Sequence, residues 1–144
     1  MQQYTKQSDI VGITFSAFDL FHAGHVAMLK EAKQHCDYLI VGLQIDPSLE
    51  RSDKNKPIQS VFERYVQLKG SIYVDEIIPY ATESEICDIL LTYDIDIRFI
   101  GEEYKDREFS GLQICEEHGI KIHYNERKHS FSSSGLRKRI QQAS

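Results

Sequence analysis

Two histidines in the stretch "FDLFHAGH" (residues 18–25) are the side chains in this sequence best suited to chemistry. His22 and His25 are three positions apart, are separated by Ala23 and Gly24, and follow an apolar run at 10–15. On a helix they would lie on one side of the first turn, where N–H groups and the positive end of the helix dipole bind phosphate. Imidazoles placed there can donate hydrogen bonds to oxygens whose charge grows during group transfer. The pattern therefore indicates a polyphosphate site.

The same spacing also fits two ordinary histidines on the surface or in the core. A metal site is disfavoured, because zinc-binding helices carry H-E-x-x-H, with histidines four apart and a glutamate that is absent here. Cys36, Cys87 and Cys115 form no C-x-x-C pair. We therefore expect reduced thiols of an intracellular protein rather than disulfides or a zinc centre.

Apolar and amphipathic segments alternate along the whole chain. The apolar runs predict strands at 10–15, 38–44, 75–80, 96–101 and 120–124, and the amphipathic runs predict helices at 25–35, 61–71, 83–93, 110–119 and 132–142. This alternation is typical of an α/β fold, an open parallel five-stranded sheet with helices on both faces. We expect a single domain over residues 1–144, with residues 1–8 as a flexible N-terminal tail.

Charge and hydropathy limit the partners. The net charge of −5 provides no global basic field, so we do not expect nucleic acid as a partner. The first residues form no apolar signal region, and no run is apolar enough to cross a bilayer. We therefore expect a cytoplasmic protein without membrane contact.

Residues that follow the predicted strands matter most, because open parallel sheets bind ligands at the carboxyl ends of their strands. After the second strand, Lys54 and Lys56 lie in the long polar stretch 46–60, and Arg64 follows on the next helix. Loops of this length are often functional, although such a charge run is also common on solvated surfaces. After the fourth strand, Gly101 permits close backbone approach and Tyr104 could stack on a base, although an ordinary acidic loop fits as well.

The stretch "ERKHSFSSSG" follows the fifth strand. Arg127 and Lys128 precede Ser132, Ser133 and Ser134 at the start of the last predicted helix. Hydroxyls and N–H groups at a helix N-terminus bind phosphate. One serine would suffice as a helix cap, so three serines after an arginine favour a second phosphate-binding segment.

Together, "FDLFHAGH", "KNK…ER", "YVDEIIP" and "RKHSFSSS" resemble the cytidylyltransferase-like nucleotidyltransferases with an H-x-G-H motif, above all the small glycerol-3-phosphate cytidylyltransferases of bacteria. The resemblance runs from about residue 11 to residue 140. It implies a Rossmann-like sheet in a homodimer, with Mg²⁺ bound to the nucleoside triphosphate. It also implies a reaction in which a substrate phosphate attacks the α-phosphorus of the triphosphate and pyrophosphate leaves.

The resemblance also implies roles for individual residues. His22, His25, Lys56 and Arg127 would be catalytic, and Lys54 and Lys56 would bind the acceptor phosphate. No protein side chain is assigned to a metal. The residues expected to bind the nucleotide are Ser16, Ala17, Phe18, Asp19, Ala23, Gly24, Arg64, Gly101, Glu103, Tyr104, Lys128, His129, Phe131, Ser132, Ser133 and Ser134.

The sequence departs from the family pattern before the first histidine. Ser16 and Ala17 stand where glycine and threonine are usual, which removes the threonine hydroxyl. We expect a cytidylyltransferase that joins CTP to a small phosphorylated alcohol, with glycerol 3-phosphate as the first guess and cell-surface polymer precursors as the destination. The alternatives are an adenylyltransferase of the same superfamily that uses ATP, and a nucleotide-binding protein with little turnover.

Overall fold

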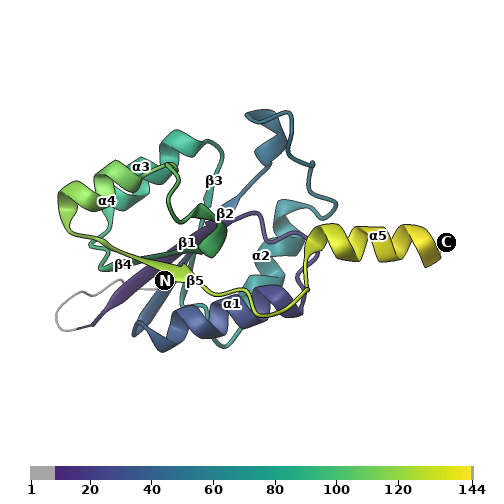
Figure 1. The fold of residues 1–144 in the computed structure, drawn as a ribbon, viewed down its shortest axis with the longest axis horizontal. Coiled ribbons are helices and arrows are strands. Elements are labelled where there is room, and N and C mark those ends of the chain that lie inside the picture. Colours follow the sequence, from purple (N-terminus) through teal and green to yellow (C-terminus); the bar gives the residue numbers. More distant parts are fainter. Residues whose placement is uncertain (1–8, 144) are drawn as a thin grey trace.

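A five-stranded parallel sheet forms the centre of the molecule. The computed structural model describes residues 9–143, so the tail expected at 1–8 lies outside the described residues. The strands are β1 (Val11–Ser16), β2 (Tyr38–Gln44), β3 (Glu76–Tyr80), β4 (Ile97–Gly101) and β5 (Lys121–Asn125). Their order is β3-β2-β1-β4-β5 and every pairing is parallel, which confirms the predicted fold class (Figure 1).

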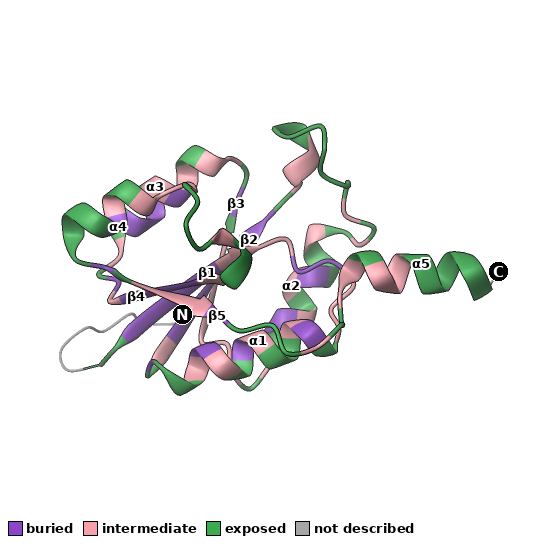
Figure 2. Ribbon diagram, in the orientation of Figure 1, coloured by how far each residue is buried: buried purple, intermediate pink, exposed green. Residues whose placement is uncertain are grey.

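Helices cover both faces of the sheet. The helices α1 (Ala23–Gln34) and α2 (Val61–Lys69) pack on one face, and α3 (Glu83–Thr92) and α4 (Leu112–His118) pack on the other (Figure 1). The strands are rich in valine and isoleucine and are buried from both sides, as crossover helices require. The last helix, α5 (Ser133–Ala143), has no buried residue and projects from the body (Figures 1 and 2).

The observed boundaries differ from the expected ones at two functional segments. Helix α1 begins at Ala23 rather than near His25, because the side chain of His22 caps it. The long stretch 46–60 contains a short 3₁₀ helix, Pro47–Leu49, and the "GEEY" stretch forms another, Glu102–Tyr104. No helix within residues 9–143 is long and apolar enough to cross a membrane.

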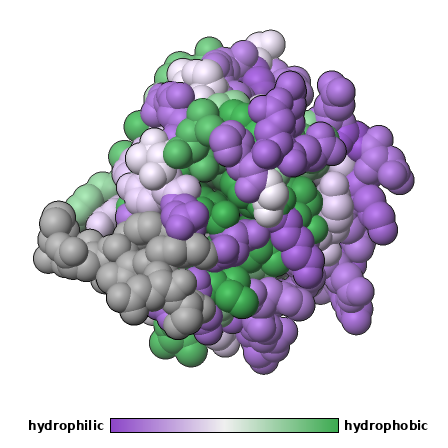
Figure 3. Space-filling view, turned by 90° about the vertical axis from the view of Figure 1, so that its left-hand side faces the viewer, coloured by the Kyte–Doolittle hydropathy of each residue, from purple (hydrophilic) through white to green (hydrophobic). Residues whose placement is uncertain are grey.

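The connection from β1 to α1 lies where the strand order reverses. Strand β1 pairs with β2 on one side and with β4 on the other, because the chain adds β2 and β3 on one side of β1 and then crosses over to add β4 and β5 on the other. Such a switch point opens a crevice at the carboxyl ends of the strands. Figure 3 looks onto the opposite edge, where the strands begin, and shows an apolar area framed by hydrophilic side chains.

Candidate functional site

Two adjoining pockets lie at the carboxyl edge of the sheet. The first, which we call the histidine pocket, has a volume of about 370 Å³ and is lined by the "HAGH" turn, the end of β4 and the segment from β5 to α5. The second, which we call the arginine pocket, has a volume of about 650 Å³ and is lined by the ends of β1–β4 together with the 47–54 and 107–110 loops. Phe15, Ser16, Ile100 and Tyr104 line both pockets and form their common wall.

Hydrogen bonds at the start of α1 determine the tautomers of both histidines. The backbone N–H of Gly24 donates to Nδ1 of His22 over 3.0 Å, and the backbone N–H of His22 donates to Nδ1 of His25 over 3.1 Å. An Nδ1 atom that accepts a hydrogen bond carries no proton, so the neutral ring holds its proton on Nε2. The helix cap therefore turns both imidazoles into Nε2–H donors at one edge of the histidine pocket.

Ser133 connects this turn to the start of α5. Nε2 of His22 lies 3.2 Å from Oγ of Ser133, whose hydroxyl donates to the carbonyl oxygen of Asp19 over 2.9 Å. Because the serine proton is used on Asp19, Oγ accepts from His22. The side chain of Ser132 has a different role, since its Oγ accepts from the N–H of Gly135 and caps α5. The serine cluster thus joins the histidine turn although more than 100 residues separate them in the sequence.

Burial keeps the two imidazoles uncharged. Desolvation, followed by the neighbouring His22, lowers the pKa of His25 from 6.5 to about 3, against a small opposing effect of Asp19. Desolvation, followed by His129 and Arg127, also lowers the pKa of His22. The rings stack with centroids 3.9 Å apart, an arrangement that two imidazolium cations would oppose. Near neutral pH both groups therefore act as uncharged hydrogen-bond donors.

Gly24 is required by the close approach of these rings. A Cβ atom at this position would lie 2.8 Å from Cε1 of His22 and 3.1 Å from Cε1 of His129. The residue lines the histidine pocket, so a side chain here would displace an imidazole or fill ligand space. Its role was expected from the sequence, and the structure supplies the steric reason.

The residues before the histidines support the site from behind. Phe18 is 1% exposed and its ring packs 5.3 Å from that of His25. The carboxylate of Asp19 accepts from the N–H groups of Ile58 and Gln59 and pairs with Arg137. Neither Phe18 nor Asp19 lines the two pockets. The direct nucleotide contacts expected of them are therefore replaced by positioning roles: one supports His25, and the other ties the 46–60 stretch and α5 to the turn.

Arg64 also differs from expectation. It is 2% exposed, and its guanidinium donates to the carbonyl oxygens of Ala17, Gln44, Gln59 and Ile45. Four of its five N–H groups are thereby used. The structure assigns Arg64 to holding three loop segments together at the sheet edge, rather than to the nucleotide contact that the sequence suggested.

Most of the remaining expected site residues line one of the two pockets, and a few lie outside both. Lys54 and Ala17 line the arginine pocket, whereas Lys56 is exposed on the loop and lines neither pocket. Ala23 and Ser134 are exposed outside both pockets, and Lys128 lies in a separate hollow beside α1, paired with Glu126. The expected residues that line the histidine pocket are Ser16, His22, Gly24, His25, Gly101, Glu103, Tyr104, Arg127, His129, Phe131, Ser132 and Ser133.

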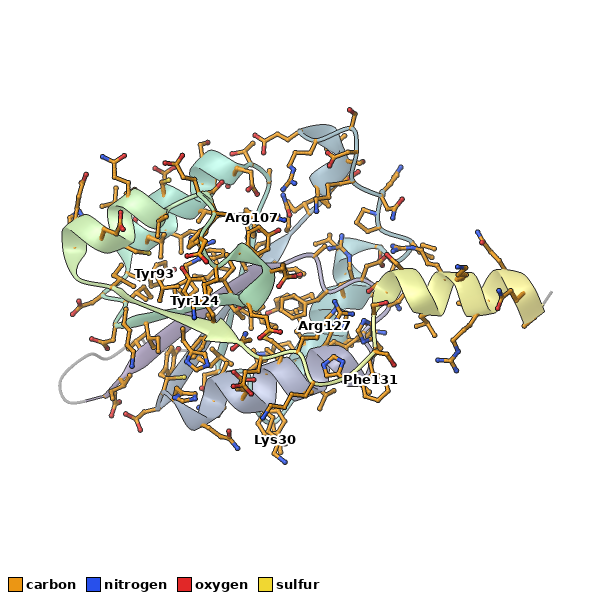
Figure 4. The ribbon with its side chains drawn as sticks, viewed as in Figure 1. Lys30, Tyr93, Arg107, Tyr124, Arg127 and Phe131 are labelled. Carbon is orange, nitrogen blue, oxygen red and sulfur yellow. The ribbon has the colours of Figure 1, made fainter. Side chains whose placement is uncertain are left out.

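Arg127 and Phe131 form the outer wall of the histidine pocket. Nη2 of Arg127 donates to the carbonyl oxygen of Phe131 over 2.9 Å, and the Phe131 ring stacks on His129 with centroids 5.0 Å apart. Figure 4 shows both residues on the segment that leads from β5 to α5, whereas Arg107 lies on the α3 side of the sheet edge. The two pockets thus carry cations on opposite sides.

Asn125, Arg98 and Glu83 are among the pocket residues that were not singled out from the sequence. Asn125, at the end of β5, is 5% exposed, lines the histidine pocket, and its Oδ1 has no hydrogen-bond partner among the described residues. Arg98 and Glu83 line the arginine pocket. Arg98 lies inside a strand, where an arginine gives no local indication of a pocket. Asn125 directly follows the predicted fifth strand, and its position after a strand was the available signal.

Described residues provide no ready-made metal centre. No group of three or more histidine, cysteine, aspartate or glutamate side chains within residues 9–143 could hold a metal ion. Cys36, Cys87 and Cys115 are free thiols, and Cys36 and Cys115 are buried.

Comparison with known proteins identifies similar chains in several organisms. The chain is 29% identical over 123 residues to the bifunctional protein HldE of Paramagnetospirillum magneticum, with 85% of this chain and 25% of that protein covered. It is 38% identical over 104 residues to a probable ethanolamine-phosphate cytidylyltransferase of Encephalitozoon cuniculi, with 70% of this chain and 31% of that protein covered. The chain spans about a quarter to a third of the length of these relatives.

A solved structure shares the fold. The lipopolysaccharide core biosynthesis protein of Thermoplasma volcanium superposes with a TM-score of 0.69 at 23% identity, covering 85% of this chain and all of that one. The family model described as cytidylyltransferase-like matches residues 13–139, which include the histidine turn, both pockets and most of α5. The chain therefore belongs to the cytidylyltransferase-like family.

Proposed function

We propose that this protein transfers a nucleotidyl group from CTP to the phosphate of a small phosphorylated alcohol, releasing pyrophosphate. Membership in the cytidylyltransferase-like family supports an enzyme of the nucleotidyltransferase type. Glycerol 3-phosphate is the acceptor that the sequence suggested first. Catalysis by a homodimer in the cytoplasm remains part of the proposal.

One observation carries the proposal: the two pockets adjoin at the carboxyl edge of the sheet and share a wall. The reaction requires the acceptor phosphate to reach the α-phosphorus of the bound triphosphate. The histidine pocket supplies the uncharged Nε2–H group of His25 beside a helix N-terminus, which suits the triphosphate. The arginine pocket carries Arg51, Lys54 and Arg107 at its rim, which suits the acceptor phosphate.

The chemistry needs little beyond positioning and charge stabilisation. An oxygen of the acceptor phosphate is anionic at neutral pH, so no general base has to remove a proton. It forms a bond to the α-phosphorus while the bond between that phosphorus and the bridging oxygen breaks, and pyrophosphate leaves. His25, held as an Nε2–H donor by the backbone N–H of His22, would stabilise oxygens whose charge grows in the transition state.

Repulsion between the two polyanions is the main obstacle to the reaction. Lys54, at the rim of the arginine pocket, and Arg127, on the other side of the shared wall, would each neutralise one partner. Mg²⁺ bound to the triphosphate would supply further charge neutralisation. Phosphate oxygens, water and at most one or two carboxylates would hold this ion, as is common for Mg²⁺, since no group of three or more ligating side chains exists among the described residues.

The unpaired Oδ1 of Asn125 supports a base that carries an exocyclic amine. A buried acceptor without a partner is costly, and a bound nucleotide can satisfy it. Cytosine presents such an amine and uracil does not, so Asn125 favours CTP over UTP. Adenine also carries an exocyclic amine, so Asn125 does not distinguish CTP from ATP. The two nucleotides have to be compared in the assay.

Pyrophosphate release tests the proposal directly. The full chain is incubated with CTP, ATP, UTP or GTP, with magnesium, and with a panel of phosphate monoesters that includes glycerol 3-phosphate. We expect pyrophosphate to form with CTP and to require an acceptor. His25→Ala should lose about 10²–10³-fold in kcat, as does removal of one oxyanion donor, whereas His118→Ala, an exposed histidine on α4, should not change it. Turnover that is equal in both variants contradicts the role of His25, and nucleotide binding without any pyrophosphate contradicts the transferase proposal.

A further inference from the structure

The arginine pocket differs in character between its rim and its floor. Three cations, Arg51, Lys54 and Arg107, lie at the rim with one carboxylate, Glu108, and all four residues are exposed. The rim therefore carries an excess positive charge, which a phosphate dianion balances. This part of the pocket explains how a phosphate is attracted, but it does not explain what else the ligand contains.

The floor is nearly neutral. It holds one cation, Arg98, which is 4% exposed, and one carboxylate, Glu83. The guanidinium of Arg98 lies 5.0 Å from the ring centroids of both Phe15 and Phe109, and its Nη1 donates to the carbonyl oxygen of Ser110. Its Nε has no hydrogen-bond partner among residues 9–143. A buried guanidinium with an unused donor at the bottom of a pocket points to a ligand that accepts hydrogen bonds.

Glu83 is held so that it can accept hydrogen bonds from a ligand. Its carboxylate accepts from the hydroxyl of Ser110 over 2.9 Å and from the amide of Gln44 over 3.4 Å. An ionised carboxylate offers about four acceptor positions, so at least one remains for a ligand. Tyr80, 2% exposed, also lines the floor, and burial followed by the charge of Glu83 raises its pKa, which keeps its phenol protonated.

The floor therefore offers both donors and acceptors, and its one positive and one negative charge balance. A polyhydroxylated body matches this arrangement, because each hydroxyl both donates and accepts. A charged group of either sign would meet one like charge on the floor, Arg98 for an ammonium or Glu83 for an anion, so the floor gives neither of them a net charge attraction. The volume of about 650 Å³ lies within the range of pockets for drug-sized ligands, and a three-carbon body would leave much of it to water.

We propose that the acceptor is the phosphate monoester of a polyhydroxylated, sugar-sized body, whose hydroxyls are recognised by Glu83, Arg98 and Ser110 at the floor of the arginine pocket. This inference rests on the proposed function and adds its substrate class. It separates this protein from enzymes that use phosphoethanolamine, although a probable ethanolamine-phosphate cytidylyltransferase is among its relatives.

The experiment compares acceptors and variants of the full chain. Glucose 1-phosphate, glycerol 3-phosphate, phosphoethanolamine and inorganic phosphate serve as probes, and binding is measured by calorimetry beside pyrophosphate release. We expect the hexose phosphate to bind best and phosphoethanolamine to bind worst. Glu83→Gln keeps an oxygen that can accept from Ser110 but removes the negative charge and one set of lone pairs. It should weaken the binding of hexose phosphate about tenfold, which corresponds to the loss of about one hydrogen bond. Glu116→Gln, at an exposed glutamate of α4 outside both pockets, should leave the preference for hexose phosphate over inorganic phosphate unchanged.

The outcomes separate this inference from the proposed function. Pyrophosphate release with phosphoethanolamine as the best acceptor, unaffected by Glu83→Gln, overturns the inference and leaves nucleotidyl transfer in place. Hexose phosphate binding that depends on Glu83, without any pyrophosphate release, supports the inference and overturns the function. Ser110→Ala gives a second test if the Glu83 variant does not fold, and should reduce hexose phosphate binding more than inorganic phosphate binding. Equal binding of all four probes in every folded variant overturns the inference.

Discussion

The depressed pKa of His25 should make the stability of this protein fall in mild acid. In the unfolded chain the imidazole has its ordinary pKa of 6.5, whereas burial lowers the pKa in the folded protein to about 3. Between these values the unfolded state binds a proton that the folded state does not. The contribution of His25 to the stability is therefore fully present at pH values above the unfolded-state pKa. It is lost progressively as the pH falls toward the folded-state pKa.

The size of this loss in stability follows from how far the pH lies below the unfolded-state pKa of His25. Each pH unit in this window costs about 1.4 kcal/mol, so at about pH 5 the contribution of His25 has fallen by about 2 kcal/mol relative to its value above about pH 7. Other groups titrate in the same range, and the measurement therefore needs a matched variant. His25→Asn serves, because its side-chain oxygen can accept the backbone N–H of His22 as Nδ1 does, while the amide does not titrate.

Urea unfolding followed by circular dichroism, at several pH values between about 5 and 7.5, measures the difference. We expect the free energy of unfolding of the native chain to fall by about 2 kcal/mol more than that of His25→Asn over this range. If the free energies of unfolding of the two proteins changed with pH in parallel, the reasoning would be refuted. His25 would then have the same pKa in the folded and unfolded states. The stacked, neutral histidine pair would then be the wrong description of the site.

Three further predictions concern the support of the site. Gly24→Ala should fold but lose most of its nucleotide affinity, because the added Cβ meets the His22 ring at 2.8 Å; calorimetry with CTP checks this, and native affinity would contradict it. Arg64→Met should lower the free energy of unfolding by ~3 kcal/mol or more, because four carbonyl oxygens lose their donors, and a denaturation midpoint within error of the native one would contradict the positioning role. Ser133→Ala should cost about 1 kcal/mol and increase hydrogen exchange in α5, because it removes the bridge between His22 and Asp19; unchanged exchange would show that the bridge does not hold α5 in place.

Local sequence determined most of the fold. Runs such as "YLIVGLQ" can be buried only in a central parallel strand, and the alternation with amphipathic segments leaves few topologies for a chain of this length. The "HAGH" turn and the C-terminal serines were found for the same reason, because phosphate-binding groups follow strands in this class of fold. Helix α1 starts two residues earlier than expected because a histidine, rather than a usual capping residue, accepts the first N–H bonds.

Tertiary structure decided what each of these residues does. Arg64 and Asp19 carry charges that look suitable for a ligand, but long-range packing directs them to backbone groups from distant segments. Arg98 looks like an ordinary strand residue, and only the meeting of β1, β4 and the 107–110 loop places it on the floor of a pocket. The sequence by itself determined the elements and the edge of the sheet where chemistry can occur, because periodicity and strand ends are local properties. Which side chains face the ligand and which hold the scaffold depends on contacts between residues far apart in the chain, and only the folded structure sets those contacts.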